Sequence, residues 1–409
     1  MAASNQNDEL IAHFRNPYPS YEAIRKKRLI RDAQGAWYAG RFEDVSSILK
    51  DRRFGKQPPP GTEANMPAGR IQEQRDRRTI LNTDPPDHTR LRGLVTKAFS
   101  AHRVEAMRPN IQRLVDTIVD RVEARGHMDL VSEYAFPIPA TIISDMLGIP
   151  DGDRLRFAGL SNDIIAFGSG IRPDMDPEVQ QQKAQHATAE FDRYLAELFV
   201  IKRRGADDDL TTALIRAEDE EGKLSEEELT QNIRLLFMAG HETTVNLMSN
   251  AVVALFNYED QLRLLKENPA LMPAAVEEFL RFDPSVQQLP RVAQEDLEIG
   301  GQTIRAGEMV FCVLGGANRD PDVYPEADRL NIERPFVRSM SFGGGIHFCL
   351  GAQLARIETE IALNTLFQRL PSLRITNLDD LRYPMNPIFR GPAQLLAEWD
   401  TESAASAYD

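Results

Sequence analysis

The chain has 409 residues, 42% of them hydrophobic and 27% charged, so it can bury a substantial core beneath an ordinary polar surface. Its formal net charge of −14 argues against a protein that wraps nucleic acid, because nucleic-acid phosphates need a dense basic face. Two cysteines are too few for a disulfide framework, and neither a secretory signal nor an apolar run of about 18 residues is visible. We therefore expect a cytoplasmic protein that binds neither nucleic acid nor a membrane.

The first half of the chain combines short strand signals with long helical stretches. Residues 35–40, GAWYAG, predict a strand, and residues 42–51, FEDVSSILKD, predict the helix that follows. The segment Lys56–Arg70 is rich in proline and glycine, which forbids regular structure and predicts a long loop. Helical periodicity then dominates from Asp87 to about Arg203, and it is interrupted at Phe167–Pro177, where we expect a second loop.

The second half contains the longest predicted helix. We expect an acidic linker, Arg216–Leu224, to come before it. Ser225 followed by Glu228 has the spacing of a capping box, and no proline occurs before Tyr258. Such a helix would measure about 50 Å, enough to cross a whole domain. The later predicted elements are a helix over Leu271–Phe282, a β-hairpin over residues 297–314, a helix after Cys349 and a strand-like C-terminal segment. The pattern predicts a mainly α fold with a minor β region and no clean domain boundary.

The most glycine-rich part of the chain, SFGGGIHFCLG over Ser341–Gly351, contains one of the two cysteines. It is not a phosphate-binding loop, because Ile346, His347 and Phe348 stand where that loop needs lysine followed by serine or threonine. A zinc site through His347 and Cys349 would need further ligands that no second cluster offers, and a buried structural cysteine is another alternative. Cys349 at the start of a helix would favour a thiolate, and the glycines would let the backbone lie against a planar cofactor. A haem iron with a cysteine axial ligand has these requirements.

The longer stretch FGGGIHFCLGAQLAR, residues 342–356, resembles the haem-binding loop of the cytochromes P-450, and the resemblance covers nearly the whole chain. It implies a single triangular, mainly α domain over residues 1–409 with a small β region. The haem (heme b) would lie between the long central helix on one side and the cysteine loop and last helix on the other. The resemblance further implies that Cys349 is the axial iron ligand, that His347 contacts a haem propionate, and that Phe342 and Gly351 pack around the ligand loop.

The stretch AGHETT, residues 239–244, lies midway along the long helix. At 100° per residue, Gly240 and Thr243 share one stripe of the helix. Taken alone, this could be a tolerated glycine and a threonine bonded to a carbonyl of the preceding turn. The stretch resembles the family's oxygen-activation motif, which implies that Ala239 and Gly240 border the haem, that Thr243 hydrogen-bonds the dioxygen and that Glu242 supplies protons. Because Glu242 projects off the stripe, we expect it to act through water or a flexible turn.

Three further basic residues match the positions at which the family holds the haem propionates. His88 and Arg92 are four residues apart on one predicted helical face, which suits two donors to one anionic edge. Arg291 follows the predicted helix that ends at residue 282. Each of the three could be a solvated surface charge, but together with His347 the resemblance favours propionate contacts.

The sequence EEFLR places Glu278 and Arg281 at positions i and i+3 of a predicted helix. By itself this spacing is typical of an ordinary helix ion pair worth a few tenths of a kcal/mol. The resemblance implies instead a structural pair that locks the fold beneath the haem.

The resemblance implies a monooxygenase that inserts one oxygen atom of O2 into an organic substrate. The sequence has no flavin or nicotinamide fingerprint and no cysteine set for an iron–sulfur cluster, so we expect electrons from a separate ferredoxin and ferredoxin reductase. Lys97, Arg103 and Arg356 are candidates for docking that partner. Two alternatives stay open: a peroxide-driven haem-thiolate enzyme, whose members usually lack the acid–alcohol pair, and a non-catalytic haem-binding protein.

The substrate is expected to be a hydrophobic small molecule such as a terpenoid, steroid, fatty acid or aromatic compound. We expect the two loops, Lys56–Arg70 and Phe167–Pro177, to open and close over its pocket, and the protein to be a monomer. The expected lining residues are mainly apolar: Ile233, Phe237, Val286, Leu289 and Ile388.

Overall fold

The computed structural model describes residues 10–66, 78–168, 176–205, 207–221 and 224–401. Its helices are α2 (Tyr18–Lys27), α3 (Phe42–Lys50), α5 (Asp87–Thr96), α6 (Ala101–Glu105), α7 (Arg108–Val122), α8 (Pro137–Leu147), α9 (Arg154–Gly168), α10 (Pro177–Arg204), α11 (Leu210–Glu221), α12 (Glu226–Asn257), α13 (Glu259–Glu267), α14 (Met272–Phe282), α15 (Leu314–Ala317) and α16 (Ala352–Arg369). Its strands are β1 (Leu29–Arg31), β2 (Trp37–Ala39), β3 (Phe54–Gly55), β4 (His127–Asp129), β5 (Gln288–Ala293), β6 (Leu297–Ile299), β7 (Gln302–Ile304), β8 (Met309–Val313), β9 (Arg374–Ile375) and β10 (Leu396–Glu398).

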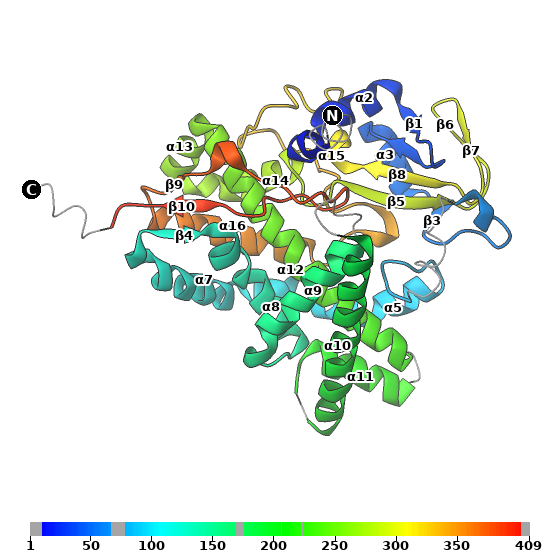
Figure 1. Ribbon diagram of the computed structural model, residues 1–409, viewed down its shortest axis with the longest axis horizontal. Helices are drawn as coiled ribbons and strands as arrows, with labels where there is room; N and C mark the ends of the chain where they lie inside the picture. Colours follow the sequence, from blue (N-terminus) through cyan, green and yellow to red (C-terminus); the bar gives the residue numbers. More distant parts are fainter. Residues whose placement is uncertain (1–9, 67–77, 169–175, 206, 222–223, 402–409) are drawn as a thin grey trace, which may run out of the picture.

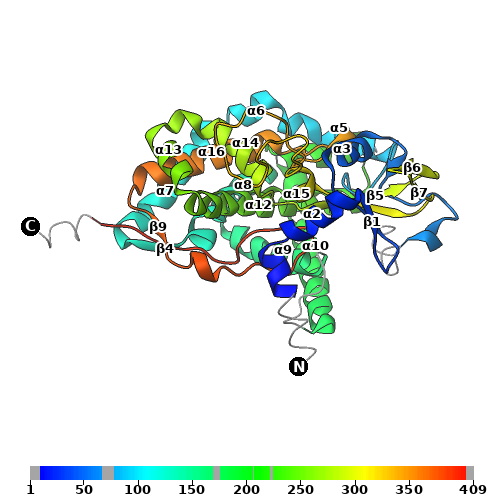
Figure 2. The ribbon, with the colours of Figure 1, turned by 90° about the horizontal axis from the view of Figure 1, so that it is seen from above.

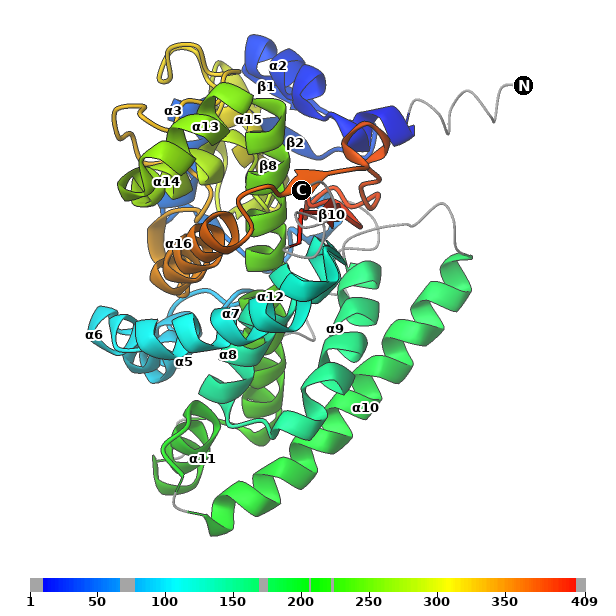
Figure 3. The same ribbon diagram turned by 90° about the vertical axis from the view of Figure 1, so that its left-hand side faces the viewer.

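The 32-residue helix α12 lies at the centre of the fold. The Ser225 hydroxyl accepts a hydrogen bond from the Glu228 N–H (3.1 Å), and the Glu228 carboxylate accepts one from the Ser225 N–H (3.0 Å), so the predicted capping box forms. α12 packs against α8, α14 and α16, and Figures 2 and 3 show it running through the molecule among them. Residues 239–244 therefore lie midway along a helix that runs through the middle of the fold.

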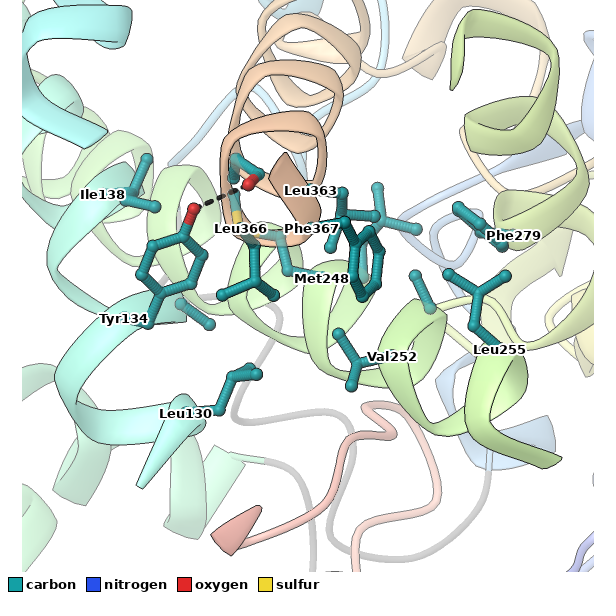
Figure 4. Packing of buried hydrophobic residues seen from close by; sticks show 14 of the residues in the cluster. Leu130, Tyr134, Ile138, Met248, Val252, Leu255, Phe279, Leu363, Leu366 and Phe367 are labelled. Atoms are coloured by element: carbon teal, nitrogen blue, oxygen red, sulfur yellow. Dashed lines mark hydrogen bonds between the residues drawn. The ribbon is translucent and has the colours of Figure 1, made fainter. Parts of the chain in front are cut away.

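Apolar side chains fill the space between α12 and α16 (Figure 4). From the segment before α8, the Tyr134 hydroxyl donates a hydrogen bond to the Ala362 carbonyl of α16 (2.6 Å). Burial of each aliphatic or aromatic side chain contributes about 1.5–3 kcal/mol, so these contacts hold α16, and with it the cysteine loop that precedes it, against α12. The residues labelled in Figure 4 are Leu130, Tyr134, Ile138, Met248, Val252, Leu255, Phe279, Leu363, Leu366 and Phe367.

The largest sheet has five strands in the order β1-β2-β8-β5-β3, and Figure 1 shows it beside α2 and α3 at one end of the molecule. β2 pairs with β8 in parallel, with Tyr38 opposite Phe311, and the other neighbours are antiparallel. A three-stranded sheet has the order β4-β10-β9, and β6 pairs with β7 alone. In the part of the chain that the structure describes, no helix is both long enough and apolar enough to span a bilayer.

Most predicted elements are confirmed, and the errors have separate causes. The strand at residues 37–39 and the helices α3, α12, α14 and α16 lie where the sequence predicted them. The segment Arg216–Leu224 is not a linker, because α11 continues to Glu221; alanine and glutamate are good helix formers, and the acidic composition was misread. Strand β4 interrupts the region predicted as helical, because it pairs with β10, which lies far along the chain.

The two predicted loops are only partly described. Lys56–Arg70 contains the short 3-10 helix Glu63–Asn65, and residues 67–70 lie outside the described part of the chain. In Phe167–Pro177, α9 extends to Gly168 and α10 begins at Pro177, while residues 169–175 lie outside the described part. The predicted hairpin is correct for β6 and β7, but β8 belongs to the five-stranded sheet.

Candidate haem-binding site

The cysteine loop connects residue 341 to the start of α16. Gly343 and Gly345 have φ of 67° and 66°, in the left-handed region that glycine occupies without strain. A Cβ on Gly345 would lie 2.2 Å from the Leu49 carbonyl oxygen, so glycine also allows the loop to pack closely on α3. The Cys349 N–H donates to the Phe342 carbonyl (3.0 Å) and closes the loop. Together these features present Cys349 with an exposed side chain.

The surroundings of the Cys349 thiol differ from those expected at a helix start. α16 begins at Ala352 with Gly351 as its N-cap, so Cys349 precedes the helix and does not lie in its first turn. Although the side chain is accessible, protein surrounds it closely enough that desolvation raises the pKa of the thiol, against the opposing effects of the Gly351 N–H and the charges of Arg92 and Arg356. The protein groups alone therefore do not hold a thiolate, whereas a coordinated metal cation would.

Basic side chains from separate segments meet beside this loop. His88 and Arg92 come from α5, Arg291 from β5, His347 from the loop itself, and Lys56 from the chain that follows β3. The rings of His88 and His347 have centroids 4.3 Å apart. Burial, followed by the charges of Lys56, Arg291, His88 and Arg92, lowers the pKa of His347 to about 2, which shows how closely these groups gather around it. The four predicted propionate residues are thus brought together.

Lys56 is a member of this cluster that the sequence analysis assigned only to a loop. Its side chain is 5% exposed, and its ammonium donates to the Pro290 carbonyl (3.3 Å). Burial, and then the charge of Arg291, lowers its pKa well below the usual value. The sequence signal for this buried lysine was its position between a strand and a run of prolines. No periodicity distinguishes such a lysine from one whose side chain is exposed to solvent.

The cluster fits the carboxylate edge of a haem. Buried cations are costly unless they are paired, and within the described residues Asp84 is the acidic neighbour whose charge acts on Lys56, His88 and Arg291. The Nε2 atoms of His88 and His347 are buried, and no hydrogen-bond partner for them occurs among the described residues. Two propionates would supply both the missing charge and the missing partners.

Alternative metal sites lack a ligand set. Within the described ranges, no group of three or more His, Cys, Asp and Glu side chains is arranged to hold a metal ion, so the zinc interpretation has no support. Cys312 is buried in β8, and burial raises its pKa to about 12. Of the two cysteines, Cys349 is therefore the one that a haem iron can reach.

The central turn of α12 carries an acid and an alcohol. The Thr243 hydroxyl donates to the Ala239 carbonyl (2.9 Å), the back-bonded geometry that the sequence allowed. Glu242 has a buried Oε2 that lacks a partner within the described residues, and burial raises the pKa of its carboxyl to about 7. Ala239 is exposed, although it lies in the middle of the helix. A Cβ on Gly240 would lie 2.8 Å from Ile143 of α8, so close packing against α8 explains this glycine.

Glu278 and Arg281 form a buried network beyond an ordinary helix pair. Both side chains are buried, and the guanidinium donates two hydrogen bonds of 2.7 Å to the carboxylate. The Arg334 guanidinium adds bonds of 3.1 and 3.2 Å to the same carboxylate. The remaining Arg281 donors reach the carbonyls of Asn318, Ala327 and Arg329. The network ties α14 to the segment between α15 and the cysteine loop.

The predicted substrate residues fall into two groups. Val286, Leu289 and Ile388 are partly exposed, and the Gln287 N–H donates to the Ile388 carbonyl (2.7 Å), so the segments that carry them lie side by side. Leu289 also lies near the cysteine loop, since a Cβ on Gly343 would be 3.1 Å from it.

Ile233 and Phe237 do not lie with these three residues. Both are completely buried, and Phe237 contacts the rings of Phe157 and Phe191 in a core cluster. The structure places them in the hydrophobic core, because the side of α12 that carries them packs against neighbouring helices.

Comparisons with known proteins agree with this geometry. A family model described as Cytochrome P-450 matches residues 42–380. Cytochrome P-450 107B1 of Saccharopolyspora erythraea is 40% identical over 392 residues, covering 91% of each chain, and vitamin D(3) 25-hydroxylase of Pseudonocardia autotrophica is 39% identical over 402 residues, covering 96% of each. A myxobacterial cytochrome P-450 solved in complex with myristic acid superposes with a TM-score of 0.87 at 36% identity, covering 96% of this chain and 98% of that one. The chain therefore belongs to the cytochrome P-450 family of haem-thiolate monooxygenases.

Proposed function

We propose that this haem-thiolate monooxygenase oxidises a hydrophobic small molecule, with Cys349 as iron ligand and Glu242 and Thr243 as its proton-delivery pair. The observation that carries the proposal is the joint placement of an accessible cysteine and a cluster of basic side chains. Asp84 is the acidic neighbour of that cluster within the described residues, and two of its imidazole nitrogens have no partner there. When bound, the haem supplies the activation of dioxygen and the oxidation of the substrate.

The chain's own residues would hold the cofactor and move protons. Lys56, His88, Arg92, Arg291 and His347 would bind the propionates and so fix the orientation of the porphyrin.

The pKa of Glu242 lies near neutrality, where a carboxyl group can both release and regain a proton. Its buried oxygen would pass protons toward the Thr243 hydroxyl through water, because no direct bond joins the two side chains among the described contacts. The acid–alcohol pair favours monooxygenation over the peroxide-driven alternative.

The substrate is inferred to be an apolar molecule. Val286, Leu289 and Ile388 are apolar and partly exposed, and Leu289 lies beside the cysteine loop; we call these three residues the apolar wall. Two of the relatives are named with apolar compounds: one is a vitamin D(3) 25-hydroxylase, and another was solved in complex with myristic acid. This supports the substrate class and leaves the individual compound open to screening.

Electrons are inferred to come from a separate ferredoxin and reductase. Lys97 and Arg103 are exposed on the segment that follows α5. α5 itself is tied to the cysteine loop, because its Arg92 guanidinium donates a hydrogen bond to the Phe348 carbonyl (2.6 Å). Arg356 is less suited to docking than expected, because it is paired with Glu277 and lies 4.6 Å from the Phe342 ring.

The cytoplasmic location, the monomeric state and the single-domain organisation stay predictions.

The carbon monoxide difference spectrum of the reduced protein tests the proposal. Thiolate ligation gives the Soret band at the wavelength that names the family, and Cys349→Ser should abolish that band while Cys312→Ser keeps it. A band at the shorter, histidine-like wavelength in the wild type would contradict thiolate ligation. Product formation with hydrogen peroxide but none with a ferredoxin system would favour the peroxygenase alternative.

A further inference from the structure

A hydroxyl outside the known motifs is bonded to the turn that carries the acid–alcohol pair. Ser285, in the segment between α14 and β5, is buried, and its hydroxyl donates to the Thr243 carbonyl of α12 (2.6 Å). A serine hydroxyl has one proton to donate, and a carbonyl oxygen can accept a second hydrogen bond in addition to one within its helix. The bond therefore fixes the Thr243 peptide from outside the helix.

The same serine belongs to the wall of the substrate site. The Arg390 N–H donates to the Ser285 carbonyl (2.8 Å), and Val286 forms an isolated antiparallel bridge with Phe389. These contacts join residues 285–287 to residues 388–390, the segments that carry Val286 and Ile388. Ser285 thus links both segments to the Thr243 turn through its side chain and its backbone.

A second anchor holds this wall at a different point on α12. The Asn250 amide donates to the carbonyls of Asp283 (3.1 Å) and Arg390 (3.0 Å), and Asp283 pairs with the Arg390 guanidinium (2.8 Å). Asn250 lies seven residues, about two turns, after Thr243, so the two anchors share a face of α12. Without the Ser285 hydroxyl the Asn250 anchor would still hold the wall, whereas the Thr243 carbonyl would lose the hydrogen bond that reaches it from this segment.

We propose that Ser285 is a positioning residue, whose hydroxyl holds the Thr243 turn of α12 and makes that turn respond to molecules that press on the wall at Val286 and Ile388. The inference rests on the proposed function, in which this turn delivers protons. Its physical basis is that this bond joins the wall directly to the Thr243 turn, whereas the Asn250 anchor joins the wall to α12 about two turns away. A substrate that orders the wall would then also order the turn.

Amide hydrogen exchange of the haem-loaded enzyme tests the bond. In Ser285→Ala, amides of residues 240–247 should exchange about five-fold faster than in the wild type, the change expected when one hydrogen bond no longer opposes local opening. Ser285→Thr keeps the hydroxyl and should restore slow exchange. Ser249→Ala is the matched control, because Ser249 is also buried, lies on α12, and has a hydroxyl with no partner among the described residues.

The link to the wall is tested with 4-phenylimidazole, whose phenyl ring would fill the apolar site. The probe should slow exchange at residues 240–247 in the wild type and in Ser249→Ala, and should do so less in Ser285→Ala. When a ferredoxin system supplies electrons from NADH, Ser285→Ala should also release more hydrogen peroxide per NADH consumed, because a loosened turn delivers protons less reliably.

Three outcomes would overturn the inference: unchanged exchange in Ser285→Ala, equal acceleration in both alanine variants, or equal protection by the probe in all proteins. Failure of the proposed function is separately visible, because the wild type would then lack the thiolate Soret band whatever its exchange pattern.

Discussion

Replacing Glu242 by glutamine should remove a pH-dependent loss of stability. Burial raises the pKa of this carboxyl from the usual 4.5 to about 7, and its Oε2 has no hydrogen-bond partner within the described residues. Because the folded-state pKa is raised, the folded state favours the protonated acid. The wild type therefore has its full stability below pH 4.5 and loses part of it as the pH rises through 7. A shift of about 2.5 pKa units corresponds to about 3 kcal/mol, at 1.36 kcal/mol per unit.

Urea unfolding of the haem-loaded proteins at pH 5 and pH 8 measures this effect. The quantity compared is the difference in unfolding free energy between Glu242→Gln and the wild type, in which the other titrating groups cancel. We expect the variant to gain about 2–3 kcal/mol relative to the wild type on going from pH 5 to pH 8. Glu227→Gln is the control, because that side chain is exposed in the first turn of the same helix. An equal difference at both pH values would refute the argument that burial raises the pKa of Glu242.

The same variant separates proton delivery from haem binding. Glutamine keeps the shape of the side chain but cannot release a proton, so product formation with a ferredoxin system should fall on the order of 10²-fold. The thiolate Soret band should stay in place. Turnover equal to that of the wild type would show that protons reach the site by another route.

Three further predictions concern the charged side chains around the site. Lys56→Met should speed haem transfer to apomyoglobin about ten-fold or more, because a charge-assisted hydrogen bond is worth about 1.5–3 kcal/mol; an unchanged rate would remove Lys56 from the propionate set. Glu278→Gln should lower the unfolding free energy by about 3–5 kcal/mol, because it leaves the buried Arg281 without its counter-ion, and a loss below about 1 kcal/mol would show that Arg334 and the carbonyls suffice. Arg103→Glu should slow reduction by ferredoxin at low ionic strength and match the wild type at high salt, as stopped-flow measurement can show; equal rates at low salt would exclude it from docking.

The sequence was most informative where chemistry depends on local spacing. The capping box at Ser225 and Glu228 predicted the start of α12, since both hydrogen bonds involve residues three apart. The glycine-rich stretch Ser341–Gly351 indicated a loop ahead of the last helix, and Gly343 and Gly345 have the positive φ angles that suit such a loop. Such features require no knowledge of distant parts of the chain.

Long-range contacts account for several features that the sequence did not predict. β4 is three residues long and forms only because β10, hundreds of residues later, pairs with it. Phe237 shares its helical turn with motif residues, yet it packs into the core formed with α9 and α10, which the period of α12 alone cannot reveal. Ser285 has no pattern of its own, and its contact with Thr243 follows from how the segment after α14 returns to α12.

Two buried ionic groups in this protein differ in how completely the chain satisfies them. Glu278 is bonded to Arg281 and Arg334, and the spare donors of Arg281 reach backbone carbonyls, so that network is complete without any ligand. Lys56 and Arg291 instead each donate from the side chain to the single carbonyl of Pro290 within the described residues, and both have pKa values lowered mainly by burial. Asp84 is the acidic neighbour of both cations among the described residues, so a ligand that brings further negative charge would stabilise them. This contrast supports a structural role for the Glu278 network and the proposed ligand-binding role for the cluster that contains Lys56 and Arg291.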